Sequence, residues 1–256
     1  MEIFYINLDK DVERRESMER QLAELGLSYQ RIPGVYARGL DEEGLNRVYS
    51  RKRALRRHSM DLVLAHVGCS MSKILAYREI VERDLPYALI LEDDVIIPQD
   101  FNRCLEEVEQ LVSASKAEIL LLSPADGDFS NHKLIREKGA HQAAPYVYGH
   151  LASSYVVTKF AAQSLLQELF PIDDVADCWP RLNRYRVVDI WVLKQSLIEQ
   201  DQETFGSSTN ADFKPFPNVV AKAKYKLRRL RGIVLDRITA PWRRQFHPYN
   251  DVLKQK

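Results

Sequence analysis

Three adjacent carboxylates, Glu92, Asp93 and Asp94, stand between two apolar runs in the segment LILEDDVII, residues 89–97. Desolvation and mutual repulsion both oppose such a cluster, so a cationic group is expected beside it. Carboxylate oxygens suit Mg²⁺ or Mn²⁺, which use few protein carboxylates and leave coordination positions for substrate phosphates. The triplet therefore predicts a metal–diphosphate site, and a solvated turn after a strand is the competing interpretation.

The three carboxylates need not share one role. Alternation along a strand predicts that Glu92 and Asp94 point to one side of a sheet and Asp93 to the other. We take Asp94 as the first candidate metal ligand. Glu92 is the second, or else it reaches the nucleotide or the water shell of the metal, and Asp93 is grouped with the residues that contact the nucleotide.

The elements that position this triplet follow from the apolar pattern, which opens as strand, helix, strand and predicts a parallel α/β sheet. Strands are expected at residues 3–8, 28–35, 87–91, 118–122, 155–157 and 187–193, and helices at 11–25, 67–84, 101–112 and 159–169. Residues 39–57 and 124–145 are expected to be irregular. Ligands of open α/β sheets bind at the carboxyl ends of strands, and the triplet follows one such end.

Composition narrows the class of protein. Basic and acidic residues nearly balance, so bulk charge does not indicate nucleic-acid binding. The three cysteines are far apart and form no CxxC pair, so neither a disulfide framework nor a thiolate zinc site is expected. The first residues lack the pattern of a secretory signal, and no segment is apolar over the length of a membrane span. We therefore expect a chain of the reducing cytosol.

Three separated segments resemble glycosyltransferase family 25. Residues 4–22, FYINLDKDVERRESMERQL, resemble the opening of that family, GCSMSK at 68–73 resembles its G-C-x-x-S-H segment, and YALILEDDVII at 87–97 resembles its L-E-D-D-V strand. Residues 148–166 and PIDD at 171–174 are more weakly similar to two later segments. The order and spacing agree over residues 2–200, which is more specific than any single motif.

The resemblance implies a GT-A-like α/β fold, with a mainly parallel central sheet flanked by helices, over residues 1–203. It also implies an inverting, metal-dependent transfer of galactose from UDP-galactose to a lipooligosaccharide or lipopolysaccharide acceptor, with Mn²⁺ or Mg²⁺. The alternatives are a glucosyl- or N-acetylhexosaminyltransferase of the same fold, and a non-catalytic sugar-binding module. A nucleotidyltransferase would need a Gly-rich phosphate loop, which the sequence lacks.

The resemblance also indicates which residues contact the donor near the first strand. Asn7 and Leu8, at the end of that strand, are expected beside the base and ribose, although an ordinary strand-to-helix turn would use the same residues. Arg14 or Arg15 could bind the diphosphate with two parallel hydrogen bonds. A surface ion pair with Asp11 is the alternative for Arg15.

Two further donor contacts and the catalytic base come from later segments. Ser72 could donate to a phosphate, with helix capping as the competing use. Lys73 stands where the family usually has His; a protonated Lys can bind a phosphate but cannot ligate a metal, so a metal role here is in doubt. Inversion requires a base for the acceptor hydroxyl, and Asp173 is our first candidate and Asp174 the second, with helix capping as the alternative.

The last quarter of the chain is basic. Residues 222–244 carry nine Lys or Arg side chains against the single acid Asp236. Interleaved apolar residues indicate an amphipathic helix at an anionic membrane surface, and a solvated helix or an RNA-binding tail is the rival. We expect residues 204–256 to form an extension that holds the protein at the inner face of a bacterial inner membrane, near a lipid-linked acceptor.

Overall fold

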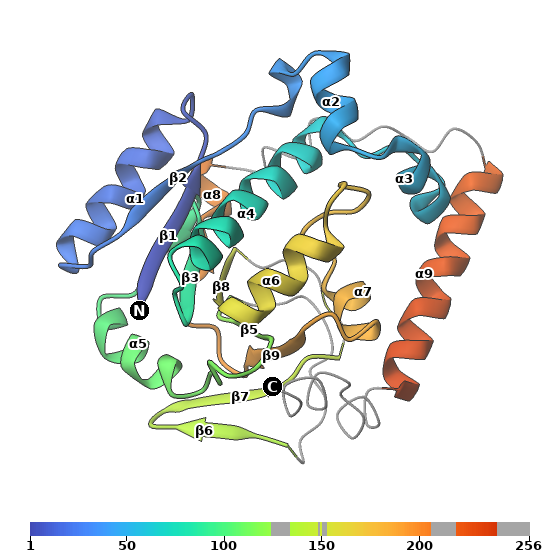
Figure 1. Ribbon diagram of the computed structural model, residues 1–256. Helices are drawn as coiled ribbons and strands as arrows, with labels where there is room; N and C mark the ends of the chain where they lie inside the picture. The colour runs from blue at the N-terminus through green and yellow to red at the C-terminus, as the bar shows by residue number, and fades with distance from the viewer. Residues whose placement is uncertain (124–133, 148, 150–152, 206–218, 240–256) are drawn as a thin grey trace.

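The predicted strands lie side by side in one sheet, as the computed structural model of residues 1–123, 134–147, 149, 153–205 and 219–239 describes (Figure 1). The sheet has eight strands in the order β2-β1-β3-β8-β5-β9-β7-β6. Their bounds are β1 Glu2–Asn7, β2 Gln30–Pro33, β3 Tyr87–Glu92, β5 Glu118–Leu121, β6 Arg136–Lys138, β7 His141–Pro145, β8 Ser154–Thr158 and β9 Asp189–Leu193.

Most strands of this sheet run in one direction. β1 pairs in parallel with β2 and β3, and β5 pairs in parallel with β9. β8 is antiparallel to both β3 and β5, and β7 is antiparallel to β9 and β6. Only β8 and β7 of the eight strands therefore run against the others. This confirms the predicted α/β fold class, with a mainly parallel central sheet flanked by helices.

Helices cover both faces of the sheet (Figure 1). One face packs against α1 (Val12–Glu24) and α5 (Phe101–Glu109), and the other against α4 (Leu64–Glu82), α6 (Lys159–Glu168) and α7 (Trp179–Arg184). The strands are buried on both faces because their side chains alternate between the two layers. The α1–α5 layer receives Ile3, Tyr5, Leu89 and Leu91, and the α4–α6 layer receives Phe4, Ala88 and Ile90.

Two segments predicted to be irregular are in fact ordered elements. Residues 39–57 include α2 (Glu42–Val48) and most of α3 (Arg51–His58), after a short 3-10 turn, η1 (Ala37–Gly39). Asp41 caps α2 by accepting a hydrogen bond of 2.7 Å from the amide of Gly44. The apolar pattern missed α3 because RKRALRRH has only two apolar residues. The described end of the 124–145 segment forms the β6–β7 hairpin.

The chain after β9 returns to the acidic triplet. β10 (Glu199–Gln200) pairs with β4 (Val95–Ile96), the short strand that follows the triplet, and α8 (Gln202–Phe205) comes next. The predicted boundary at residue 203 falls inside α8, and the division into two domains stays a prediction. α9 (Val219–Thr239) contacts α7. No helix in the described ranges is both long enough and apolar enough to span a bilayer.

Candidate active site

The acidic triplet lies at the carboxyl end of β3, beside the carboxyl end of β1. Ile6 of β1 is paired with Glu92, which ends β3, and the chain turns at Asp93 and Asp94 before it continues as β4. The triplet is therefore at the edge of the sheet where ligands of α/β folds bind. At this edge also lie the end of β1, the first turn of α1, the middle of α4 and the β10–α8 segment.

Asp93 is held by two of the predicted donor-binding residues. The side-chain amide of Asn7 donates to Asp93 Oδ2 at 2.7 Å, and Arg14 Nη1 donates to Asp93 Oδ1 at 2.9 Å. Burial raises the pKa of Asp93, and these two contacts oppose that rise without cancelling it. Arg14 also lies 3.3 Å from Asp94 Oδ2, so one guanidinium group serves two carboxylates.

Asp94 has one oxygen that is bound and one that is not. Its Oδ2 accepts a hydrogen bond of 3.0 Å from the side chain of Gln200, and its backbone carbonyl accepts one of 2.7 Å from the amide of Asp201. Its Oδ1 is buried and has no hydrogen-bond partner among the described residues. Leaving a buried carboxylate oxygen without a partner is unfavourable, so this atom is suited to a cation or donor that the chain itself does not supply.

Glu92 points to the other side, where α4 supplies Lys73. The ammonium group of Lys73 lies 3.0 Å from Glu92 Oε1 and 3.5 Å from Asp177 Oδ2, and its side chain is 1% exposed. Burial lowers the pKa of Lys73, but Asp177 and Glu92 outweigh burial and raise it well above its ordinary value, so the group stays charged. Burial raises the pKa of Glu92, and Lys73 opposes that rise.

The predicted alternation holds for two members of the triplet and is wrong for the third. Glu92 contacts Lys73 in the α4 layer, and Asp93 contacts Arg14 of α1, as alternation requires. Asp94 was expected on the side of Glu92, but it shares Arg14 with Asp93. The reason is local: residues 93 and 94 form a turn, and the twofold alternation of a strand ends where the strand ends.

The cationic groups beside the triplet are side chains, and those that the described residues supply are too few to balance it. Four carboxylates meet here, those of the triplet and Asp177, and their described ion pairs are with Arg14 and Lys73. We call these six residues the acidic site. The site thus holds two more negative charges than positive charges among these groups. Raised pKa values at Glu92 and Asp93 are the electrostatic result, because each carboxylate is desolvated with less than one cation of its own.

The other donor-binding residues predicted near the end of β1 differ in whether they reach the acidic triplet. Asn7 is buried, and Arg31 of β2 holds it by donating from Nε to its side-chain oxygen at 3.1 Å. Leu8 accepts a backbone hydrogen bond from Asp11 as the chain enters α1. Of the two arginines, Arg14 reaches the acidic site, whereas Arg15 is half-buried one position further along α1.

Ser72 lies next to Lys73 but is used for packing between elements. Its hydroxyl donates to the carbonyl of Gly68 at 2.8 Å and accepts from the amide of Val35, also at 2.8 Å. A Cβ built on Gly68 would lie 2.4 Å from the carbonyl oxygen of Val35, so only glycine allows α4 to come this close to the segment after β2. These contacts give GCSMSK a structural role, and phosphate binding by Ser72 stays a prediction.

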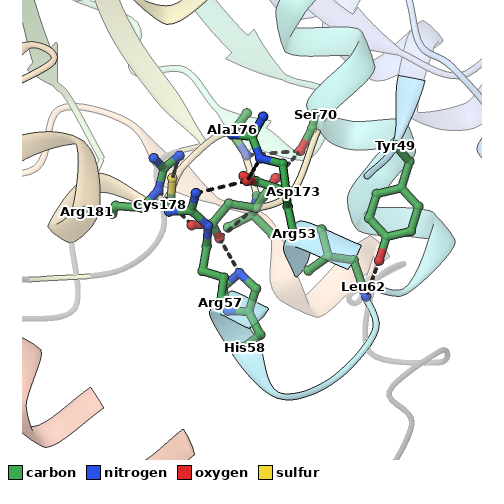
Figure 2. A network of polar contacts seen from close by, with 12 residues as sticks. Tyr49, Arg53, Arg57, His58, Leu62, Ser70, Asp173, Ala176, Cys178 and Arg181 are labelled. Carbon is green, nitrogen blue, oxygen red and sulfur yellow. Dashed lines mark hydrogen bonds and ion pairs between the residues drawn. The ribbon is translucent and has the colours of Figure 1, made fainter. Parts of the chain in front are cut away.

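The two residues predicted as catalytic bases lie in a separate network of ion pairs; Figure 2 shows this network around Asp173. Asp173 has a side chain that is 2% exposed, and its Oδ2 accepts from Arg53 at 2.7 Å and from Arg57 at 2.9 Å. Both arginines come from α3, so the network fastens this helix to the α6–α7 connection. We call this set of residues, Asp173 and Asp174 with the cationic groups that contact them, the α3 clasp.

Asp174 forms the second half of the α3 clasp. His58 Nε2 lies 3.0 Å from its Oδ1, and Arg181 of α7 donates to its Oδ2 at 2.8 Å. Burial raises the pKa of Asp174, but the contacts with His58 and Arg181 outweigh burial, and the net effect is a lowered pKa. Arg181 also pairs with Glu168. Catalysis by Asp173 or Asp174 stays a prediction, since the geometry uses both to hold α3.

Three residues of the site were not found from the sequence. Asp177 joins Lys73, Gln200 binds Asp94, and Arg31 orients Asn7. Asp177 had a detectable signal, because it is the third acid in the segment PIDDVAD, and the same chain segment reaches both networks. Gln200 had none: it arrives through the antiparallel pairing of β10 with β4, a contact across more than a hundred residues.

Comparison with known proteins identifies the class of protein. Residues 1–178 match the sequence family described as glycosyltransferase family 25 (LPS biosynthesis protein). This match covers more than half of the chain, and the chain belongs to glycosyltransferase family 25. The family was correctly predicted from the segments around Asn7, Lys73 and the acidic triplet.

The chain is also similar to curated proteins of three animals. The chain is 25% identical over 190 residues to procollagen galactosyltransferase 1-A of Xenopus laevis, covering 68% of this chain and 30% of that protein. It is 24% identical over 188 residues to procollagen galactosyltransferase 2 of Homo sapiens, covering 68% and 29%. A glycosyltransferase 25 family member of Drosophila melanogaster is 26% identical over 179 residues, with 67% and 29% covered. The chain spans less than a third of the length of these relatives.

Among solved structures, one described as a glycosyltransferase involved in the glycosylation of the major capsid of PBCV-1 aligns over 82% of this chain and 95% of that chain. The TM-score is 0.39 and the sequence identity is 12%.

Proposed function

We propose that this protein transfers galactose from UDP-galactose to a sugar of a lipopolysaccharide or lipooligosaccharide acceptor, with inversion at the anomeric carbon. Membership of family 25 supports a glycosyltransferase, and the curated relatives named galactosyltransferases support galactose as the sugar. The description of the family as an LPS biosynthesis protein supports the acceptor. The observation that carries the proposal is the undercompensated acidic site at the carboxyl ends of β1 and β3.

We propose that a divalent cation, Mn²⁺ or Mg²⁺, accompanies the donor at this site. The described residues contain no group of three or more His, Cys, Asp or Glu side chains placed to hold a metal. They do offer the buried, unpartnered Oδ1 of Asp94, with Glu92 as the second candidate. Mg²⁺ and Mn²⁺ are often held by one or two carboxylates together with substrate phosphates, so the residues fit an ion that arrives with the diphosphate. When bound, such an ion would neutralise charge on the departing diphosphate.

The excess of carboxylates is the physical reason for this cation. A diphosphate carries negative charge of its own, and it would be repelled by four carboxylates that share two cationic side chains. Arg14 and Lys73 reduce that repulsion, and in this proposal they keep the carboxylates in place before the donor arrives. Asn7, oriented by Arg31, holds Asp93 in place by a hydrogen bond.

For the catalytic base we propose Asp177 beside the earlier candidates Asp173 and Asp174. A base must reach the acceptor hydroxyl, directly or through one water. The side chain of Asp177 is 26% exposed and shares Lys73 with the acidic site, whereas the side chain of Asp173 is 2% exposed and is bound by two guanidinium groups. Access to an acceptor therefore favours Asp177.

The experiment that tests the function is a donor screen by UDP release and by product analysis. UDP-galactose, UDP-glucose and UDP-N-acetylglucosamine are offered with a lipooligosaccharide acceptor, with Mn²⁺, with Mg²⁺ and with chelator. We expect UDP-galactose with added metal to be turned over fastest, and the product to have inverted anomeric configuration by NMR. Equal release with all three donors, or full activity in chelator, contradicts the donor or the metal respectively.

The catalytic base is tested in the same assay with the variants Asp177→Asn and Asp173→Asn. Asp100→Asn is the matched control, because Asp100 is exposed. Loss of a general base lowers turnover by roughly 10²–10⁴-fold, and we expect this loss for Asp177→Asn while UDP binding, measured by calorimetry, is retained. A comparable loss in Asp173→Asn alone, with its stability unchanged, would instead identify Asp173 as the base.

A further inference from the structure

The helix α9 exposes an apolar strip to solvent. Its residues Val219, Leu227 and Leu230 are 83%, 69% and 59% exposed. A helix advances by about 100° per residue, so the exposed apolar side chains that the structure describes on α9 fall within an arc of about 100°. These residues, the apolar strip, are Val219, Val220, Ala223, Leu227, Leu230 and Val234.

Basic side chains border this apolar strip on both sides. By the same helical geometry, Lys222 and Lys226 lie roughly 20–60° beyond one edge of the strip, and Lys224 and Arg231 lie roughly 20–40° beyond the other. All four side chains are exposed. Positive charge therefore borders the strip on both sides between residues 222 and 231.

The opposite side of α9 faces the protein. Tyr225 lies roughly opposite the middle of the apolar strip, and it is half-buried where its basic neighbours are exposed. α9 contacts α7 and runs along one side of the molecule (Figure 1). The helix is thus attached by one face and presents the apolar strip, with its basic borders, away from the body of the protein.

We propose that this face of α9 binds the surface of an anionic lipid bilayer. An apolar strip narrower than half a helix, bordered by Lys and Arg on both sides, is typical of helices that lie in the plane of a membrane. The apolar side chains enter the boundary between headgroups and acyl chains, and the basic residues remain at the level of the anionic headgroups. The proposal goes beyond sugar transfer, and it would hold the protein at the surface where a lipid-linked acceptor resides.

Charge and apolarity together favour a bilayer over the two other occupants of such a face. A second copy of this chain would bring the same basic borders against each other, and like charges in contact oppose association. A nucleic acid would be bound by the basic residues but leaves the apolar strip without a partner. A bilayer with anionic headgroups satisfies both features at once.

The test is cosedimentation of the full chain with vesicles of phosphatidylcholine alone and of phosphatidylcholine with phosphatidylglycerol. We expect binding to the anionic vesicles to be at least about tenfold tighter, and to weaken as salt rises, because each basic residue near the surface adds to the attraction and salt screens it. Equal binding to both vesicles, or no binding to either, overturns the proposal.

Matched variants locate the contact on α9. Leu230→Asp is compared with Leu134→Asp, an exposed leucine of the described chain outside α9 that is 45% exposed against 59%. The double variant of Lys222→Glu with Lys226→Glu is compared with the double variant of Lys116→Glu with Lys138→Glu. We expect each α9 variant to lower anionic-vesicle binding at least about tenfold, and each control to retain it.

Two further measurements separate the rival occupants. Sedimentation equilibrium that shows a dimer, lost in Leu230→Asp, together with unchanged vesicle binding, overturns the proposal in favour of a second copy. Tight binding of single-stranded RNA that the Lys222→Glu, Lys226→Glu variant loses, without vesicle binding, overturns it in favour of nucleic acid. Because no donor or acceptor is present in the vesicle assay, its failure leaves the proposed transferase activity intact.

Discussion

The acidic site at the end of β3 and the α3 clasp both bring buried carboxylates to cationic side chains, but in different proportions. At the acidic site the triplet and Asp177 share Arg14 and Lys73. In the clasp Asp173 pairs with two arginines, and Asp174 pairs with Arg181 and lies beside His58.

The carboxylate pKa values of the two regions shift in opposite directions because of this difference in charge balance. Burial raises the pKa of Glu92 and Asp93 at the acidic site, and their cationic partners do not cancel that rise. In the clasp the partners of Asp174 outweigh burial, and its pKa is lowered. Carboxylates that are desolvated but undercompensated favour the arrival of another cation, whereas compensated ones hold elements together. The proportion of charges therefore distinguishes a candidate site from a structural ion pair.

The largest effect on stability is expected in the clasp. Asp174→Ala removes the anion that Arg181 and His58 share. Arg181 keeps its pair with Glu168 but loses its buried carboxylate partner, and breaking a buried pair in this way costs about 3–5 kcal/mol. Urea unfolding monitored by circular dichroism measures the loss. Affinity for UDP, measured by calorimetry below the onset of unfolding, should stay within about twofold. A large loss of UDP affinity with little loss of stability would make the clasp part of the active site and remove the distinction.

At the acidic site the same kind of change should act on turnover. Asp94→Asn keeps the shape of the side chain but removes the charge whose Oδ1 has no partner in the described structure. We expect sugar transfer to fall at least about 100-fold, or about 2.7 kcal/mol, with the free energy of unfolding unchanged or slightly higher, since repulsion within the triplet is relieved. Asp100→Asn, an exposed residue, is the control. Normal turnover in Asp94→Asn would refute the metal–diphosphate assignment.

The sequence was sufficient to predict the central layers of the fold. Each strand of the inner sheet is a short apolar run, and α1, α5 and α6 have apolar residues at helical spacing, so their burial is encoded locally. The charged helices α2 and α3 were missed because they have few apolar residues, and the position of α3 also depends on a distant partner. α3 is fastened through Arg53 and Arg57 to Asp173, more than a hundred residues away, and such pairing has no periodicity to detect.

The sequence also predicted part of the candidate site, namely the residues at the ends of β1 and β3. Asn7, Arg14 and the acidic triplet converge as expected because the ends of neighbouring parallel strands meet at one edge of the sheet. Asp173 and Asp174 lie apart from them in this structure, whereas Asp177, a few residues further on, reaches the site. Residue types alone could not distinguish these three acids, because the difference between them is which cationic side chains the fold brings to each.

A smaller, pH-dependent effect is expected from Lys73. Lys73→Met removes the ammonium group that Glu92 and Asp177 share, and loss of a nearby positive charge raises the pKa of a carboxylate. The acidic limb of the kcat/KM profile should therefore move to higher pH, with roughly tenfold lower activity on that limb and recovery at higher pH. Lys73→Arg, which keeps the charge, should restore most of the profile. Identical limbs in the wild type and Lys73→Met would show that this cation does not act on the site.

The smallest expected effect is the pH dependence of the stability that the α3 clasp contributes. The pKa of Asp174 is lowered in the folded state from its ordinary value of 3.8. A carboxylate with a depressed folded pKa stabilises the protein fully above its unfolded pKa, and this contribution is lost as pH falls through the folded pKa. The difference in unfolding free energy between wild type and Asp174→Asn should therefore be constant near neutral pH and should shrink below a pH of about 4. Unfolding curves at several pH values measure this difference.

At the acidic site the sign is reversed, because the raised pKa of Asp93 means that its charge opposes folding. Asp93→Asn loses the hydrogen bonds of the carboxylate at every pH, but it also removes this unfavourable charge. The free energy of unfolding of Asp93→Asn relative to wild type should therefore be highest near neutral pH and should fall in acid. A gap that changes in the same direction for both variants would show that the two regions do not differ in charge compensation.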